Sequence, residues 1–275
     1  MDKNLLRMVQ LTQLEIAKEV KRICTENNIH YFLDGGTLLG AVRHEGFIPW
    51  DDDLDIGMLR EDYEKFLNIA PVVMDKKYFL QTPYSDDNYG LFFSKVRKLG
   101  TVYIEKSSHA SKAHNEIWID IFPYDNYPDD TKKRKRLIKR ITLYRRILFV
   151  KSRIKPWLIK QKLFEKTICY IGYLPYRFFS CLISRKKLLF KAKSFQTQYN
   201  SQNTSYKYPQ GSEPCGQWIV PVDAFNSFEM KTFEDTNFSV PLGYDVFLKN
   251  GYGDYMQLPP EDKRENRHNI IEVKL

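Results

Sequence analysis

The feature that most constrains this 275-residue chain is an acidic stretch near its N-terminus, DGGTLLGAVRHEGFIPWDDDLDIGM, residues 34–58. Its five aspartates stand beside apolar residues such as Ile48, Trp50, Leu54 and Ile56. Like charges repel one another, and a carboxylate that is buried without a partner is strongly disfavoured. A cation must therefore compensate these charges, and we expect a divalent metal ion that carries a nucleotide.

The end of this stretch has the pattern of a metal-binding strand. The segment DLDIGML alternates acidic and aliphatic residues with a period of two, which predicts a β-strand. Asp53 and Asp55 then project from the same face, so their carboxylates converge. Oxygen ligands of this kind suit Mg²⁺ or Mn²⁺ rather than zinc. Asp120, an acid between aliphatic residues in EIWIDIFPYD, is the best candidate for a third carboxylate from a neighbouring strand.

The beginning of the stretch has the pattern of a phosphate-binding turn. Gly35 and Gly36 lie between a predicted strand, IHYFL, and a predicted helix that Thr37 caps and that runs to about Arg43. Because glycine lacks a Cβ atom, backbone N–H groups here can approach phosphate oxygens closely, and a helix N-terminus adds positive potential. The turn and the acidic strand together predict a site for a metal ion and phosphates.

Several cationic and acidic residues near this site have two interpretations. Arg43 either positions the phosphates or forms an ion pair with Asp51 or Asp52, which themselves are either turn residues or outer ligands of the metal. Lys95 and Arg97 either position the phosphates or belong to a solvated strand face.

The remaining candidates also have ordinary structural alternatives. Asp53 and Asp55 can belong to an exposed edge strand, and Asp120 can make a structural hydrogen bond. His44 and His268 are either acid–base groups or histidines with a purely structural role. Asp254 and Arg264 are explained about as well by helix capping and ion pairing as by a function in the site.

Composition excludes several classes of protein. Apolar residues make up 43% of the chain, which is enough for a packed core and argues against disorder. The four cysteines are scattered without a C-x-x-C pair, so we expect a reduced, cytosolic protein rather than a disulfide or zinc scaffold. The N-terminal residues lack the apolar run of a signal peptide, and we expect none.

Charge is distributed very unevenly along the chain. The net charge is +9, but residues 131–193 hold 21 Lys and Arg residues and a single acid, Glu165, whereas the remainder has a net charge of −11. Such asymmetry indicates an anionic partner. Apolar residues alternate with the charges at helical spacing, so we favour an amphipathic helix on an anionic membrane surface. A polyanionic acceptor is the alternative, and we expect no nucleic acid because no reading motif accompanies the charge.

These patterns predict an α/β protein, with a mixed sheet flanked by helices and a basic helical insertion. We expect residues 1–130 to form the catalytic core, residues 131–193 a basic and partly apolar helical segment, and residues 194–275 the part that completes the catalytic domain. Within the helical segment, TICYIGYLPYRFFSCLI is interrupted by Pro175 and Arg177, so it is too short for a confident membrane span.

Three segments together resemble the LicD family of phosphocholine transferases, which have the nucleotidyltransferase fold and are distantly similar to the fukutin-type ribitol-phosphate transferases. The segments are LDGGTLLGAVRHEGFIPWDDDLDIGM, WIDIFPYD and YGDYMQLPPEDKRENRH, and they occur in family order. The resemblance assigns Gly35 and Gly36 to the phosphate turn and Asp53, Asp55 and Asp120 to the metal. It implies CDP-choline as donor, CMP as leaving group, and a sugar hydroxyl of a lipid-linked or polymeric glycan as acceptor, such as a teichoic acid precursor or lipopolysaccharide.

From this resemblance we expect in-line transfer in which Asp120 orients or deprotonates the acceptor hydroxyl. An aromatic cage should hold the quaternary ammonium group of choline, which accepts no hydrogen bonds. We expect the protein in the cytoplasm, peripheral to the inner face of the membrane. The rival hypotheses are a ribitol-phosphate or other CDP-alcohol transferase or a nucleotidyltransferase, an Asp-x-Asp glycosyltransferase, and a catalytically inactive membrane-binding module.

Overall fold

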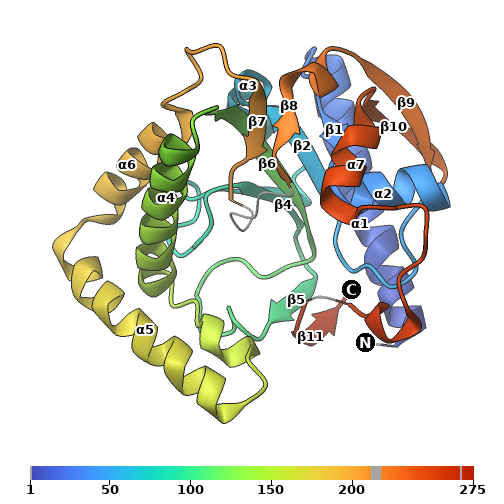
Figure 1. The fold of residues 1–275 in the computed structure, drawn as a ribbon. Coiled ribbons are helices and arrows are strands. Elements are labelled where there is room, and N and C mark those ends of the chain that lie inside the picture. Colours follow the sequence, from blue (N-terminus) through green and yellow to red (C-terminus); the bar gives the residue numbers. More distant parts are fainter. Residues whose placement is uncertain (1, 212–217, 267) are drawn as a thin grey trace.

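The computed structural model describes residues 2–211, 218–266 and 268–275, which form a mixed β-sheet with helices packed around it (Figure 1). In the described residues the main sheet has seven strands, with the order β1-β2-β6-β4-β3, and β7 and β8 continue from β6. The α/β class predicted from the sequence is confirmed. The strands of this sheet are β1 (Phe32–Leu33), β2 (Asp55–Leu59), β3 (Tyr78–Gln81), β4 (Ser94–Lys98), β6 (Trp118–Tyr127), β7 (Tyr206–Pro209) and β8 (Val220–Pro221).

Two long helices of the N-terminal half, α1 (Lys3–Glu26) and α3 (Arg60–Val73), pack against the sheet and against each other. Asp2 is the N-cap of helix α1, and its carboxylate accepts hydrogen bonds from two backbone N–H groups of the first turn. Its apolar residues recur every three or four positions, and Val9, Ile16, Val20 and Ile23 are fully buried. The buried apolar face of α1 thus packs the helix onto the sheet.

The register of the sheet positions the predicted site. Strands β2 and β6 are parallel, and Asp55 lies directly opposite Asp120. Strand β4 is antiparallel to β6 on its other side, and Lys95 lies opposite Asp120. Residues in register on adjacent strands point to the same face, so these three side chains share one face of the sheet. Ile56 and Ile121, one position further along, are fully buried on the opposite face.

Some predicted boundaries were wrong at the site. The strand expected over IHYFL is only Phe32–Leu33, and β2 begins at Asp55, so Asp53 lies just before the strand rather than in it. Helix α2 (Gly35–His44) begins three residues earlier than predicted, because Asp34, not Thr37, is its N-cap. A carboxylate at the N-cap is favoured because it accepts a hydrogen bond from the first unpaired N–H groups.

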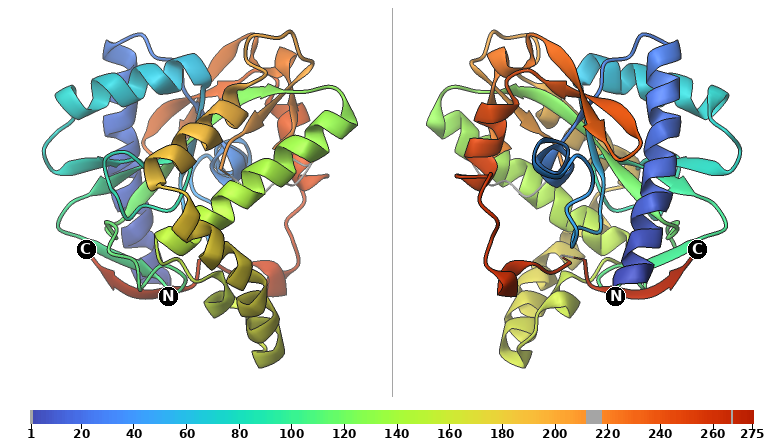
Figure 2. Two further views of the ribbon diagram at one scale, coloured as in Figure 1. Left: turned by 90° about the vertical axis from the view of Figure 1, so that its left-hand side faces the viewer. Right: turned by 90° about the vertical axis from the view of Figure 1, so that its right-hand side faces the viewer.

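Residues 131–197, which we call the helical arm, lie at one side of the molecule (Figure 1). The helical segment expected over residues 131–193 is divided: its first helix ends at Lys151, and Pro156 begins a separate short helix. Figure 2 shows one end of the arm projecting beyond the rest of the chain, which we call the body. The helices of the arm are α4 (Thr131–Lys151), η1 (Pro156–Ile159), α5 (Leu163–Leu182) and α6 (Arg185–Thr197).

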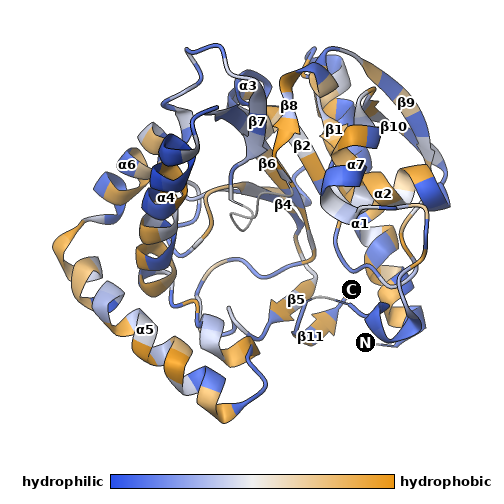
Figure 3. Ribbon diagram, in the orientation of Figure 1, coloured by the Kyte–Doolittle hydropathy of each residue, from blue (hydrophilic) through white to orange (hydrophobic). Residues whose placement is uncertain are grey.

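The two long helices of the arm differ in how they use their apolar residues. In α4, Leu137 and Leu148 are buried in clusters with α6 and β7, so its apolar side packs on protein. Helix α5 buries none of its residues, and Figure 3 shows that much of it is apolar. It continues through Pro175, where the sequence predicted an interruption. Among the described helices, none combines the length and the apolar character that crossing a bilayer requires.

The C-terminal part of the chain returns to the body. Strands β9 (Phe228–Phe233) and β10 (Thr236–Pro241) form a hairpin, and α7 (Tyr244–Tyr252) packs against α2. After the short helix η4 (Glu261–Lys263), β11 (Ile270–Lys274) pairs with β5 (Val102–Glu105). The segment between α7 and β11 passes α2, where Arg43 in the last turn of the helix contacts Tyr255 and Gln257, and it meets the acidic stretch where His268 contacts Asp52. The short helix η3 (Val222–Phe225) connects β8 to the hairpin.

Candidate active site

The glycine turn and the aspartates adjoin each other directly. Gly35 has a φ of +50°, a left-handed conformation that side chains with a Cβ atom rarely adopt. A Cβ atom on Gly35 would lie 3.2 Å from Asp55 Oδ2, and one on Gly36 would lie only 2.7 Å from Asp51 Oδ2. The left-handed backbone therefore favours glycine at position 35, a Cβ at position 36 would displace the Asp51 carboxylate, and the first turn of α2 presents its backbone to the carboxylates.

The aspartates around this turn carry more negative charge than the nearby side chains balance. Burial raises the pKa of the Asp55 carboxyl well above its ordinary value, and the charges of Asp53, Asp120, Asp34 and Asp51 raise it further. A carboxylate with so many like-charged neighbours is stabilised either by taking up a proton or by binding a cation. The donor set therefore fits a hard divalent ion.

A second grouping of carboxylates lies in the loop before β2. Single oxygen atoms of Asp51, Asp52 and Asp53 lie within 4.8 Å of one another. All are oxygen donors, as Mg²⁺ prefers. Asp53 therefore has carboxylate oxygens near it from the preceding loop, at Asp51 and Asp52, and from β2, at Asp55.

Asp120 is already paired with a cation. Lys95 donates a 2.6 Å hydrogen bond to Asp120 Oδ1, and its ammonium group lies 4.0 Å from the centre of the Trp118 ring. Burial raises the pKa of Asp120 and lowers that of Lys95, and the ion pair partly offsets both shifts. Lys95 therefore compensates the charge of Asp120, which the sequence assigned to the metal.

The space in front of the glycine turn is a cleft of about 480 Å³. Its walls combine acidic groups, aromatic rings and a few cations, and α2, the loop before β2 and residues 252–265 all contribute. Asp120, Lys95, Arg97 and Thr37 are not among the lining residues. The cleft is lined by Gly35, Gly36, Leu39, Arg43, Ile48, Trp50, Asp51, Asp53, Asp55, Trp218, Tyr252, Asp254, Tyr255, Gln257, Leu258, Pro259, Lys263 and Glu265.

The predicted cationic residues have different positions. Arg43 lines the cleft, and its guanidinium donates to the backbone carbonyls of Tyr255 at 2.6 Å and Gln257 at 3.1 Å, which holds the C-terminal segment in place. Arg97 is buried, where it donates to Gln81 and to the carbonyl of Glu116. The alternative of a solvated strand face is therefore wrong for Arg97.

Lys95 is also buried, with 4% of its surface exposed, so it too does not belong to a solvated strand face. Thr37 is buried as well, and its hydroxyl accepts a 2.8 Å hydrogen bond from the backbone N–H of Asp55. Thr37 thus joins α2 to β2 at the point where Asp55 enters the cleft.

Sequence reasoning gave too little weight to His268. Its Nδ1 lies 3.0 Å from Asp52 Oδ1, and its Nε2 lies 4.0 Å from Asp53 Oδ2. Burial alone would lower the pKa of His268, but the hydrogen bond with Asp52 and the charges of Asp53 and Asp52 outweigh it and raise the pKa to about 10. The imidazole is thus a further cation in the cluster. The motif RENRH marked it, but nothing in the sequence showed that it meets Asp52.

Asp34 was also missed. Its carboxylate accepts hydrogen bonds from the N–H of Gly35 at 2.6 Å and from the hydroxyl of Tyr124 at 2.9 Å. Burial raises the pKa of Asp34 to about 6, against the effect of these hydrogen bonds. Its position directly before the two glycines was the available signal.

Comparison with known proteins adds independent information. Residues 28–165 match the sequence profile of the family described as LicD/FKTN/FKRP, nucleotidyltransferase domain. The lipopolysaccharide cholinephosphotransferase LicD of Haemophilus influenzae is 33% identical over 273 residues, which cover 98% of this chain and 97% of that protein.

Two other relatives match over shorter regions. An uncharacterised protein of Rickettsia typhi is 51% identical over 120 residues, 44% of this chain and 35% of that protein. The human ribitol 5-phosphate transferase FKRP is 46% identical over 48 residues, 18% of this chain and 10% of that protein.

Proposed function

The chain belongs to the LicD family and is a phosphotransferase, and from this premise we propose that it transfers phosphocholine from CDP-choline to a sugar hydroxyl of a cell-surface glycan, with release of CMP. The observation that carries the proposal is the cleft in which the first turn of α2 faces Asp51, Asp53 and Asp55. The near full-length similarity to a cholinephosphotransferase supports choline as the alcohol of the donor.

Asp53 and Asp55 are the proposed metal ligands in the cleft, with Asp51 beside them and Asp120 as the third carboxylate proposed from the sequence. A bound Mg²⁺ or Mn²⁺ ion would neutralise the negative charge that develops on the phosphates during transfer. Because Asp120 is paired with Lys95, its contribution is the weakest of the four.

The chain itself binds the phosphates through the turn at Gly35 and Gly36. The backbone N–H groups at the start of α2 and the positive end of the helix favour anionic oxygens at this point. Arg43 holds residues 255–257 against α2, which closes that side of the cleft. We assign to Asp120 the task of orienting or deprotonating the acceptor hydroxyl, with Lys95 fixing the direction of its carboxylate.

Four aromatic residues of the cleft form the proposed choline site: Trp50, Trp218, Tyr252 and Tyr255. Trp218 and Tyr252 meet edge to face with 5.5 Å between their ring centres, so this wall is preformed. Aromatic faces attract quaternary ammonium groups through the ring quadrupole. The acidic groups of the same cleft add a favourable potential for the cation.

The helical arm is the proposed contact with an anionic membrane surface, where a lipid-linked acceptor would be available. Its many Lys and Arg residues each contribute roughly 1 kcal/mol near such a surface. Helix α5 supplies the apolar side of this contact, because the apolar residues of α4 pack against the body and α6.

The test is to incubate the purified chain and Mg²⁺ with CDP-choline, CDP-ethanolamine, CDP-ribitol and a nucleotide sugar, and to measure release of the nucleoside phosphate. CMP release from CDP-choline, at least about tenfold faster than from the other donors, is the expected result. Equal release from all CDP-alcohols, or release only from the nucleotide sugar, would overturn the proposal.

The second candidate is transfer of ribitol phosphate, which the local match to FKRP favours. It would use the same carboxylates and the same glycine turn. The aromatic wall distinguishes the two, because a polyol requires hydrogen-bonding partners rather than ring faces. Faster turnover of CDP-ribitol in the same assay would establish this alternative.

A further inference from the structure

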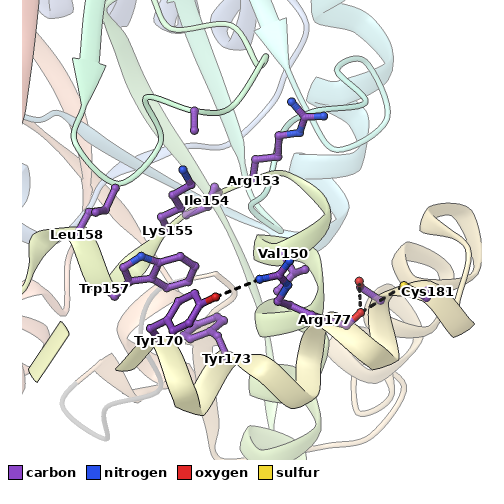
Figure 4. A pocket seen from close by; sticks show the side chains of 12 residues that line it. Val150, Arg153, Ile154, Lys155, Trp157, Leu158, Tyr170, Tyr173, Arg177 and Cys181 are labelled. Atoms are coloured by element: carbon purple, nitrogen blue, oxygen red, sulfur yellow. Dashed lines mark hydrogen bonds between the residues drawn. The ribbon is translucent and has the colours of Figure 1, made fainter. Parts of the chain in front are cut away.

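The arm contains a cavity of its own, of about 770 Å³, between the segment that follows α4 and helix α5 (Figure 4). None of its lining residues lines the carboxylate cleft. It is therefore a separate site, and an inference about it does not depend on the catalytic assignment. It is lined by Ala110, Val150, Arg153, Ile154, Lys155, Trp157, Leu158, Tyr170, Tyr173, Arg177, Ser180 and Cys181.

The walls of this cavity are mainly apolar and aromatic. Trp157 of η1 contacts two rings of α5, Tyr170 with ring centres 5.2 Å apart and Tyr173 with ring centres 5.7 Å apart. Figure 4 shows these three rings grouped on one side of the cavity. Because the rings hold one another, the apolar wall is formed before any ligand arrives, which reduces the entropic cost of binding.

The charged groups of the cavity are all cationic. Arg153 and Lys155 have no side-chain acceptor among the described residues, and Arg177 donates only to the neutral hydroxyl of Tyr170, at 3.3 Å. No carboxylate of the described residues lines the cavity. Three cations around an apolar space without a counter-ion favour a ligand that is anionic at one end and apolar at the other.

The backbone holds two of these cations at the cavity edge. Helix α4 ends in a turn in which the N–H of Ile154 bonds the carbonyl of Phe149 at 2.9 Å, and Arg153 has a φ of +58°. This is the C-terminal turn at which helices usually carry glycine. An arginine here is unfavourable for the backbone, and the turn leads through Lys155, which directly precedes η1.

The outer surface of α5 indicates where an amphipathic ligand would come from. Leu163 is 78% exposed, Phe164 73% and Leu182 68%, and no described residue covers them. A soluble anion would need neither this apolar surface nor the aromatic wall. A lipid satisfies both features, since its chains lie against α5 while its phosphate meets the cations.

We propose that the cavity binds the phosphate-bearing end of a lipid, with the phosphate at Arg153, Lys155 and Arg177 and the adjoining hydrocarbon against Trp157, Tyr170 and Tyr173. Two kinds of molecule have this chemistry: an anionic phospholipid of the bilayer and the phosphorylated lipid that carries a glycan acceptor. Binding of either would hold the arm at the membrane through a defined site rather than through charge alone.

The experiment titrates the full chain with decyl phosphate, below its micelle concentration, by isothermal calorimetry. Saturable binding is expected, whereas decanol and inorganic phosphate should each bind at least about tenfold more weakly, since each lacks one half of the ligand. Equal binding of decanol and decyl phosphate would overturn the proposal, and so would the absence of saturable binding.

Two double variants test whether decyl phosphate binds in the cavity. Arg153→Gly/Lys155→Gln removes two charges, and glycine suits the left-handed backbone, so this variant should fold and bind decyl phosphate about tenfold more weakly. Lys132→Gln/Lys133→Gln removes the same charge from the far end of α4, roughly 30 Å away, and should bind as the wild type does. Similar losses in both double variants would show that binding depends on net charge and not on the cavity.

Two longer probes distinguish the sources of the lipid. Farnesyl phosphate represents an isoprenoid carrier, and short-chain phosphatidic acid represents a bilayer phospholipid. Tighter binding of the first assigns the cavity to the acceptor's carrier, and tighter binding of the second assigns it to the membrane. Either result supports the site, provided that the Arg153→Gly/Lys155→Gln variant loses the binding.

Discussion

In the body, carboxylates gather with too few cations, whereas in the helical arm cations gather with almost no carboxylates. The excess negative charge of the body is buried around Gly35 and Gly36, where burial itself raises the pKa of Asp55. The arm's excess lies on exposed helices, where water stabilises each charge separately. The first arrangement costs folding free energy until a cation binds, and the second costs little and is available to attract an anionic surface.

The largest expected effect comes from removing one of the clustered carboxylates of the body. Asp53→Asn and Asp55→Asn should each lower CMP release by about 10³-fold, because a lost metal ligand removes several kcal/mol of stabilisation from the transition state. Turnover assays with saturating Mg²⁺ measure this. Asp235→Asn, an exposed acid paired with Lys18, is the matched control and should retain full activity.

The melting temperatures of the same variants test whether the clustered carboxylates destabilise the body until a cation binds. In EDTA, Asp55→Asn should melt at the same temperature as the wild type or higher, because it removes a buried charge that its neighbours repel. Adding Mg²⁺ should raise the melting temperature of the wild type and not that of the variant. A wild type that Mg²⁺ leaves unchanged would contradict the metal assignment.

The two regions should also respond oppositely to the same change of glycine to alanine. A Cβ on Gly36 would lie 2.7 Å from Asp51 Oδ2, so Gly36→Ala should lower CMP release by about 10²-fold, by displacing the Asp51 carboxylate from its place in the cleft. Gly172, in exposed helix α5, has nothing within 4 Å of such an atom. Gly172→Ala should leave CMP release unchanged and stabilise the arm by about 0.5–1 kcal/mol. Kinetics and urea unfolding of both variants test the contrast, which fails if Gly36→Ala retains normal activity.

A smaller effect is expected from the outer face of α5. Phe164→Ser/Leu182→Ser should weaken binding to anionic vesicles about tenfold or more, because each side chain loses apolar burial in the bilayer. CMP release in solution should not change. Val72→Ser, at a residue of the body that is 82% exposed, is the control and should bind vesicles normally. Co-sedimentation with vesicles gives the result, and equal binding of all three proteins would exclude α5 as the contact.

The smallest effect is expected at Glu15, an acid of the body that has cationic partners. Burial would raise the pKa of Glu15, but hydrogen bonds from Lys98, Lys77 and Tyr78 lower it to about 2. Because the folded pKa lies below the unfolded one, this stabilisation is complete above about pH 4.5 and is lost as the pH falls toward 2. Glu15→Gln should cost about 1 kcal/mol or less at pH 7, since the side chain is 39% exposed, and less still at pH 3. Urea unfolding at the two pH values measures this, and a cost that grows toward pH 3 would contradict it.

Local chemistry was enough to predict part of this protein from its sequence. The glycine turn, the alternation around Asp55 and the isolated acid at Asp120 depend on residues close together in the chain, and the structure places all of them on neighbouring elements. The α/β class follows from the same local periodicities. The metal, the donor and the membrane contact remain predictions.

Long-range packing decided the rest. The sequence could not show that Lys95 neutralises Asp120, or that His268 meets Asp52 from 216 positions away, because both pairs depend on strand register and on the path of the C-terminal segment. Nor could it show which long helix of the arm exposes its apolar residues. Helices α4 and α5 both carry apolar residues at helical spacing and pack against each other, but α4 also packs against α6 and buries some of its apolar residues, whereas α5 buries none.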